Sequence, residues 1–128
     1  MGSLLLLPLV LFPGCSVLHR GSKVEAAAVK LRILPLSSSV YNLADATPAY
    51  LRLGLSLALA SPAGTDDTTL KSVASDTLVS LVTAQTSTVL LTHAGKEALK
   101  QAVLAAIQKR LPGAGVKALY FDQFLVQR

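Results

Sequence analysis

The residues that could act as general acids or bases do not form a catalytic set in this chain. We expect the seven acidic residues to lie in turns, on the polar sides of helices or at a strand bend. They are Glu25, Asp45, Asp66, Asp67, Asp76, Glu97 and Asp122. No pair of these carboxylates has a spacing that indicates acid–base catalysis.

Motifs for a nucleophile, a phosphate group or a metal are likewise missing from the sequence. Serine is abundant, but there is no Gly-x-Ser-x-Gly motif and no glycine-rich phosphate loop. His19 and His93 are far apart in the sequence and lack a carboxylate-rich motif beside them, so they do not indicate a metal site. The sequence therefore predicts a protein that is not an enzyme and that needs no cofactor or metal.

Length and composition predict a single folded domain that does not bind nucleic acid. A chain of 128 residues can bury one core, and its 52% hydrophobic and 15% charged residues differ from the composition of disordered chains. The net charge of +5 divides into +3 for residues 1–35 and only +2 for residues 36–128. With no tryptophan, three tyrosines and three phenylalanines, the chain also lacks the aromatic residues that accompany basic patches in nucleic-acid binders.

Residues 1–18 are uncharged and predict a membrane segment. Its apolar residues are Leu4, Leu5, Leu6, Leu7, Leu9, Val10, Leu11 and Phe12. The segment is shorter than the roughly 20 residues of a spanning helix, and Pro8 and Pro13 interrupt it. Basic residues follow the segment and none precedes it, which is the opposite of the pattern for export. We therefore expect a transmembrane helix whose start, with its cytoplasmic tail, is truncated.

The tripeptide Gly14-Cys15-Ser16 leaves a second interpretation of this segment open. It resembles the end of a bacterial lipoprotein cleavage site, although Phe12 and Pro13 differ from the small and aliphatic residues expected there. Residues 19–36 are expected to form a linker and a short strand, and residues 37–128 the main domain. In the short strand, Val29, Leu31 and Ile33 alternate with basic residues, and Pro35 is expected to end it.

The strongest structural pattern in the chain is the row of leucines between Tyr50 and Ala60. Leucine occupies every second position, which places all five side chains on one face of a strand. These residues are Leu51, Leu53, Leu55, Leu57 and Leu59. The other face has small or polar side chains suited to solvent or to a partner.

Two helices and a last strand are expected after this strand. Apolar residues recur with helical spacing from Leu70 to Val82, after acidic residues that can cap a helix. A second stripe runs from Leu99 to Leu111, with Thr92 as the N-cap and Pro112-Gly113 as the stop. The alternation in residues 116–127 changes phase, which predicts a β-bulge near Asp122-Gln123. The fold class is therefore α+β, a small mixed sheet packed on two helices in the order β-β-α-α-β.

Several short motifs, taken in order, resemble the FliL family of flagellar basal-body proteins over about residues 40–128. They are Tyr41-Asn42-Leu43-Ala44, Tyr50-Leu51, Thr92-x-x-Gly95-Lys96-x-x-Leu99, Val116, and Phe121-x-x-Phe124-x-x-Gln127. Within this pattern we interpret Gly95, near a helix start, as a close-packing position rather than a ligand site.

The resemblance implies a stomatin-like domain in a single-pass inner-membrane protein, with the C-terminal domain on the extracytoplasmic, periplasmic side. It also implies a homo-oligomeric ring that contacts the stator proteins MotA and MotB at the flagellar basal body, with a role in flagellar rotation, chemotaxis and cell motility. No nucleic acid or small-molecule substrate is expected. The alternative is an envelope lipoprotein or a stomatin-like membrane scaffold without a motor partner.

Overall fold

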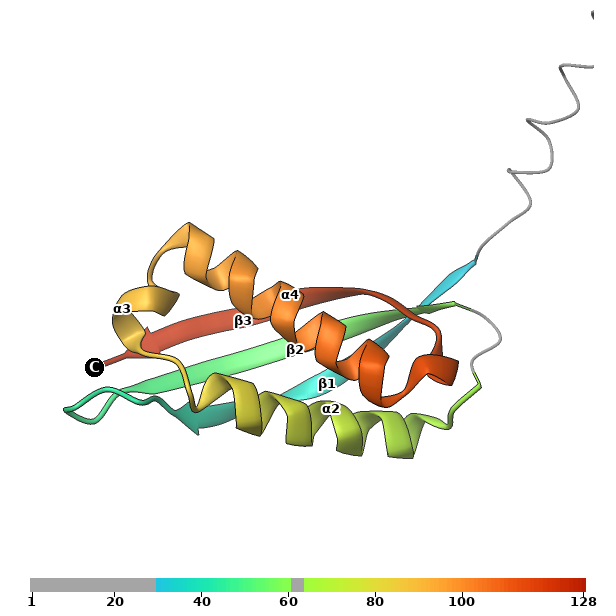
Figure 1. Ribbon diagram of the computed structural model, residues 1–128, viewed down its shortest axis with the longest axis horizontal. Helices are drawn as coiled ribbons and strands as arrows, with labels where there is room; N and C mark the ends of the chain where they lie inside the picture. The colour runs from blue at the N-terminus through green and yellow to red at the C-terminus, as the bar shows by residue number, and fades with distance from the viewer. Residues whose placement is uncertain (1–29, 61–63) are drawn as a thin grey trace, which may run out of the picture.

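Strand β2 (Tyr50–Ala60) is the central strand of a three-stranded antiparallel sheet, between β1 (Leu31–Asn42) and β3 (Val116–Gln127). Helices α2 (Asp67–Val82) and α4 (His93–Arg110) cover one face of this sheet (Figure 1). The short helix α3 (Ser87–Leu90) joins them, and a 3₁₀ turn η2 (Pro112–Ala114) precedes β3. The computed structural model describes residues 30–60 and 64–128.

The expected membrane segment, Cys15 and most of the linker lie in residues 1–29, outside the described part of the chain. Among the described helices, none is long and apolar enough to cross a membrane.

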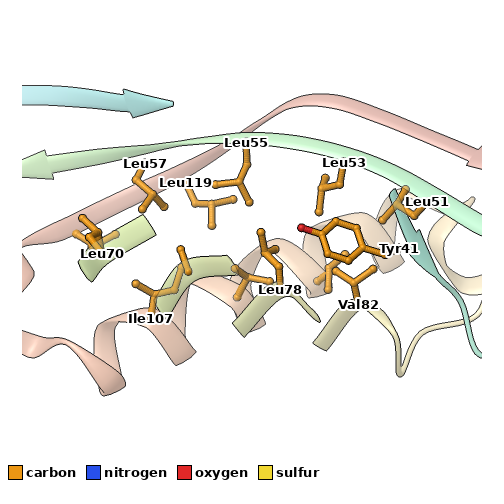
Figure 2. Packing of buried hydrophobic residues seen from close by; sticks show 14 of the residues in the cluster. Tyr41, Leu51, Leu53, Leu55, Leu57, Leu70, Leu78, Val82, Ile107 and Leu119 are labelled. Carbon is orange, nitrogen blue, oxygen red and sulfur yellow. The ribbon is translucent and has the colours of Figure 1, made fainter. Parts of the chain in front are cut away.

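The row of leucines on β2 forms the centre of the core, as the alternation predicts. All five side chains are at most 1% exposed. Figure 2 shows several of them directed toward apolar side chains of the helices, among them Leu70, Leu78 and Ile107. The strand period thus prevails over the high helix propensity of leucine.

Strand β1 differs from the prediction in its length and in its buried face. Pro35 does not end the strand, which continues to Asn42. The strand therefore crosses the boundary expected between residues 36 and 37. Because β1 is an edge strand, a proline can be tolerated where its missing N–H would point away from β2. Leu34 and Tyr41 are buried in the core, whereas Leu31 and Ile33 are exposed on the other face.

The sheet is antiparallel and not mixed, which corrects the predicted sheet type. Two long helices that run in opposite directions return the chain to the end where β2 finishes, so β3 runs antiparallel to β2 (Figure 1). The predicted bulge in β3 is confirmed, because Gly54 pairs with Gln123 and Leu55 with Phe121, which leaves Asp122 unpaired.

The predicted helix caps are confirmed. The Asp66 carboxylate accepts a hydrogen bond from the Thr69 N–H (2.9 Å), and the Thr92 hydroxyl accepts one from the Gly95 N–H (2.9 Å). The short helix α3 was not predicted, because four residues are too few to show a helical period.

We predict that Leu55→Asp unfolds the domain. Leu55 is 1% exposed, a buried leucine is worth about 1.5–3 kcal/mol, and a buried unpaired carboxylate adds a further cost. Arg52→Ala, on the exposed side of the same strand, should cost less than about 1 kcal/mol. Chemical denaturation of both variants measures this difference, and equal stabilities would contradict the assignment of the two faces.

Candidate protein-interaction surfaces

In the part of the chain that the structure describes, the candidate functional sites are surfaces and not a cavity. Over residues 30–60 and 64–128 there is no pocket and no group of three metal-ligating side chains. The features that remain are an uncovered sheet face and a cluster of lysines and phenylalanines beside α4.

The sheet face opposite the helices, here called the open face, has small residues in its middle and large apolar residues around them. Gly54, Ser56 and Ala58 of β2 are buried although no helix covers them, because side chains of the flanking strands enclose them. Of the nine large hydrophobic residues that are exposed in the described chain, six lie on this face by strand register. They are Leu31, Ile33, Val40, Tyr50, Tyr120 and Leu125.

A polar contact ties the bulge of β3 to the middle of the open face. The Ser56 hydroxyl donates a hydrogen bond of 2.6 Å to the Asp122 carboxylate. Ser56 is only 7% exposed, so this bond satisfies a hydroxyl that would otherwise be buried without a partner. The bulge that the sequence predicts therefore directs a carboxylate across the strands, a contact that the sequence alone did not reveal.

The second surface, here called the lysine–phenylalanine cluster, joins the start of α4 to β3. The Lys96 ammonium lies 5.3 Å from the centre of the Phe124 ring, and the Lys100 ammonium lies 5.7 Å from that of Phe121. The two rings are 5.4 Å apart. The two distances from lysine to ring allow a cation–π attraction, which holds the lysine side chains along β3.

Apart from Gly95, the family-motif positions fall into three groups in the structure. Lys96, Phe121 and Phe124 meet in the lysine–phenylalanine cluster. At one end of the sheet, Tyr50 on the central strand pairs in register with Asn42 on one side and with Gln127 on the other. The apolar positions Leu43, Leu51 and Leu99 are buried in the core.

Gly95 is placed where the start of α4 packs closely against the end of α3. A methyl group added at Gly95 would overlap the carbonyl group of Val89. The Thr92 hydroxyl donates a hydrogen bond of 2.7 Å to the same carbonyl oxygen while it caps α4. This geometry supports the interpretation of Gly95 as a packing position.

Asp45 links the connection between β1 and β2 to α3, a role that the sequence did not indicate. Its carboxylate accepts hydrogen bonds from the Ser87 hydroxyl and from the Ser87 N–H, the latter at 2.7 Å. Ser87 is 1% exposed. These bonds favour the ionised carboxylate and hold the pKa of Asp45 below its usual value.

Two further carboxylates beside α2 have lowered pKa values. The Thr69 N–H and hydroxyl lower the pKa of Asp66, and the Arg32 guanidinium lowers that of Asp67. The ion pair between Arg32 and Asp67 (2.9 Å) connects β1 to the start of α2. These carboxylates support the fold, because each one has its hydrogen bonds within the domain.

Comparison with known proteins identifies the family to which this chain belongs. The sequence model described as "Flagellar basal body-associated protein FliL" matches residues 33–127, which include the whole of β2, both long helices and β3. The chain belongs to the FliL family.

A curated relative supports the same family. The Flagellar protein FliL of Aquifex aeolicus (strain VF5) is 31% identical over 90 residues, which make up 69% of this chain and 56% of the relative. This FliL-family chain therefore covers little more than half the length of that relative.

We predict that Gly95→Ala destabilises the domain by about 1–3 kcal/mol, because Val89 would have to move away. In an ordinary helix the same change stabilises by up to about 1 kcal/mol. Gly113→Ala is the control, since no atom lies within 4 Å of the added methyl group. Thermal denaturation gives both values, and a stabilised Gly95→Ala variant would contradict the close packing.

We predict that Asp45→Asn lowers the melting temperature at neutral pH. In the variant the melting temperature should also fall less than in the wild type as the pH is lowered. The lowered pKa of Asp45 means that its stabilisation is present above the unfolded-state pKa of about 3.9. It is lost as the pH falls through the lower pKa of the folded state. The melting temperatures of the wild type and the variant should therefore differ most above about pH 5 and converge in stronger acid. A constant difference at every pH would contradict this account.

Proposed function

We propose that this FliL-family protein is a non-catalytic component of the flagellar basal body that associates with the stator proteins MotA and MotB and modulates motility. The observation that carries this proposal is the family match over residues 33–127. The open face and the lysine–phenylalanine cluster of residues 30–60 and 64–128 are candidate contact surfaces. The protein then acts by binding other proteins, not by changing a small molecule.

The proposed location is the inner membrane, with the C-terminal domain on its periplasmic side. Residues 1–18 support the membrane part of this location, because they are largely apolar and carry no charge. An anchored domain also reaches a far higher local concentration at its partner than a freely diffusing one. The stomatin-like fold that the resemblance implies remains a prediction.

Self-association into a ring is the proposed role of the open face. Exposed apolar patches of this kind mark contact surfaces, and burial of such a patch is the main driving force of association. The face is also nearly neutral, since Arg52 and Asp122 are the charged residues that strand register and the bond to Ser56 place on it. A second copy can therefore approach it without strong charge repulsion. A ring requires that this face contact a different surface of the neighbouring copy.

We predict that Ile33→Glu reduces crosslinking between copies on membranes and impairs swimming under high viscous load. Ile33 is 53% exposed on the open face, so a charge there should disturb association and leave the fold intact. Val79→Glu is the matched control, because Val79 is 51% exposed on α2, away from the open face. Equal crosslinking and equal motility of the two variants would contradict the proposed role of the open face.

The lipoprotein alternative is supported by Gly14-Cys15-Ser16 alone and has a direct test. If Cys15 carries a lipid, Cys15→Ser releases the protein from the membrane and abolishes its function. If residues 1–18 belong to a membrane helix, the variant stays bound and active. Membrane fractionation of the variant therefore distinguishes a lipoprotein from a helix-anchored motor component.

A further inference from the structure

The net positive charge of the described domain is concentrated in its C-terminal third. Residues 93–128 carry six basic and two acidic side chains, whereas the described residues before them carry four of each. Arg110 is paired with Asp76 (2.9 Å). Lys96 and Lys100 lie over the phenylalanine rings of β3, with Glu97 3.8 Å from Lys100 as the acidic side chain beside them.

The same region has an unpaired strand edge. Strand β3 pairs with β2 on one side, and no other described strand pairs with its second side. Near its start this edge is partly closed, because the Gln108 amide donates a hydrogen bond of 2.9 Å to the Val116 carbonyl. From Ala118 to Gln127 no further side-chain bond to the backbone of β3 occurs in the described chain. An unpaired edge of this kind is a template for an additional strand.

A second copy of this chain is a poor occupant of this edge. The other edge of the sheet belongs to β1, where Pro35 lacks an N–H and the pairing shifts between Leu36 and Ser39. Two β3 edges are also mismatched, since antiparallel pairing would bring the lysines of both copies together. The occupant must instead carry negative charge.

We propose that the free edge of β3 binds an extended, acidic segment of a partner protein as a fourth strand. Side chains of an added strand alternate between the two sheet faces. On the helix side they would meet Lys96 and Lys100, and on the open face they would lie beside Tyr120 and Leu125, which are 46% and 48% exposed. The segment therefore alternates acidic and apolar residues, and recognition combines backbone pairing with charge. This inference deepens the proposed function, since it gives the surface and the chemistry of one partner.

The test uses the full chain in a mild non-ionic detergent and a synthetic peptide of alternating glutamate and valine. Binding measured by calorimetry should weaken several-fold as salt is raised. A Lys96→Glu/Lys100→Glu variant should bind the peptide roughly tenfold more weakly and should instead bind a lysine–valine peptide. Lys71→Glu/Lys109→Glu, which changes the net charge equally at exposed lysines with no ion pair in the described chain, should bind like the wild type.

A second comparison isolates the backbone contribution. The same glutamate–valine peptide, methylated on every backbone nitrogen, keeps its charge but has no N–H group with which to pair on either edge, so its binding should be lost. Equal binding of the methylated peptide, or an equal loss in the control variant, would overturn the proposal. Tight binding to mixed micelles of the detergent and phosphatidylglycerol without binding to the peptide would also overturn it, and would identify the lysines as a membrane contact.

The peptide assay is independent of motility. Failure of the peptide to bind would refute the β3 assignment and leave the proposed motor role intact. Tight binding together with normal motility of a strain that lacks the protein would instead leave the β3 assignment standing and contradict the motor role.

Discussion

The burial of five leucines on one face of β2 is the interaction on which the rest of this domain depends. Each is worth about 1.5–3 kcal/mol, so together they are comparable with the net stability of a small domain, about 5–15 kcal/mol. A central strand can bury such a row only if helices cover that face and a strand pairs on each side. Helices α2 and α4 meet the first need, and β1 and β3 meet the second. Because both long helices cover the same face, the other face stays open and provides the surface proposed for contact between copies.

The sequence was sufficient for the elements whose signal is local. The alternating leucines, the helical stripes, the caps at Asp66 and Thr92 and the bulge at Asp122 all follow from periods and residue types within a few positions, and the structure has each of them. The FliL-family resemblance also came from the sequence, because it depends on the order of short motifs and not on contacts.

Features that depend on distant parts of the chain could not be predicted in this way. The alternation in residues 29–33 indicates a strand but cannot say which face the core will cover, and Leu31 and Ile33 are in fact exposed. The tolerance of Pro35 depends on the position of β1 at the edge of the sheet. The bond between Asp45 and Ser87 joins residues 42 positions apart, and the lysine–phenylalanine cluster joins α4 to β3, so neither leaves a local pattern.

The open face and the free edge of β3 differ in chemistry, and this difference is the reason for proposing a different partner for each. The open face is apolar and nearly neutral, which suits a second copy, whereas the edge of β3 is flanked by lysines, which suits an acidic partner. The measurement that tests the motor role most directly is an averaged electron tomogram of flagellar motors in cells with and without this protein. The account predicts density on the periplasmic side of the inner membrane, around the stator units, that disappears with the protein. Identical averages from the two strains would contradict it.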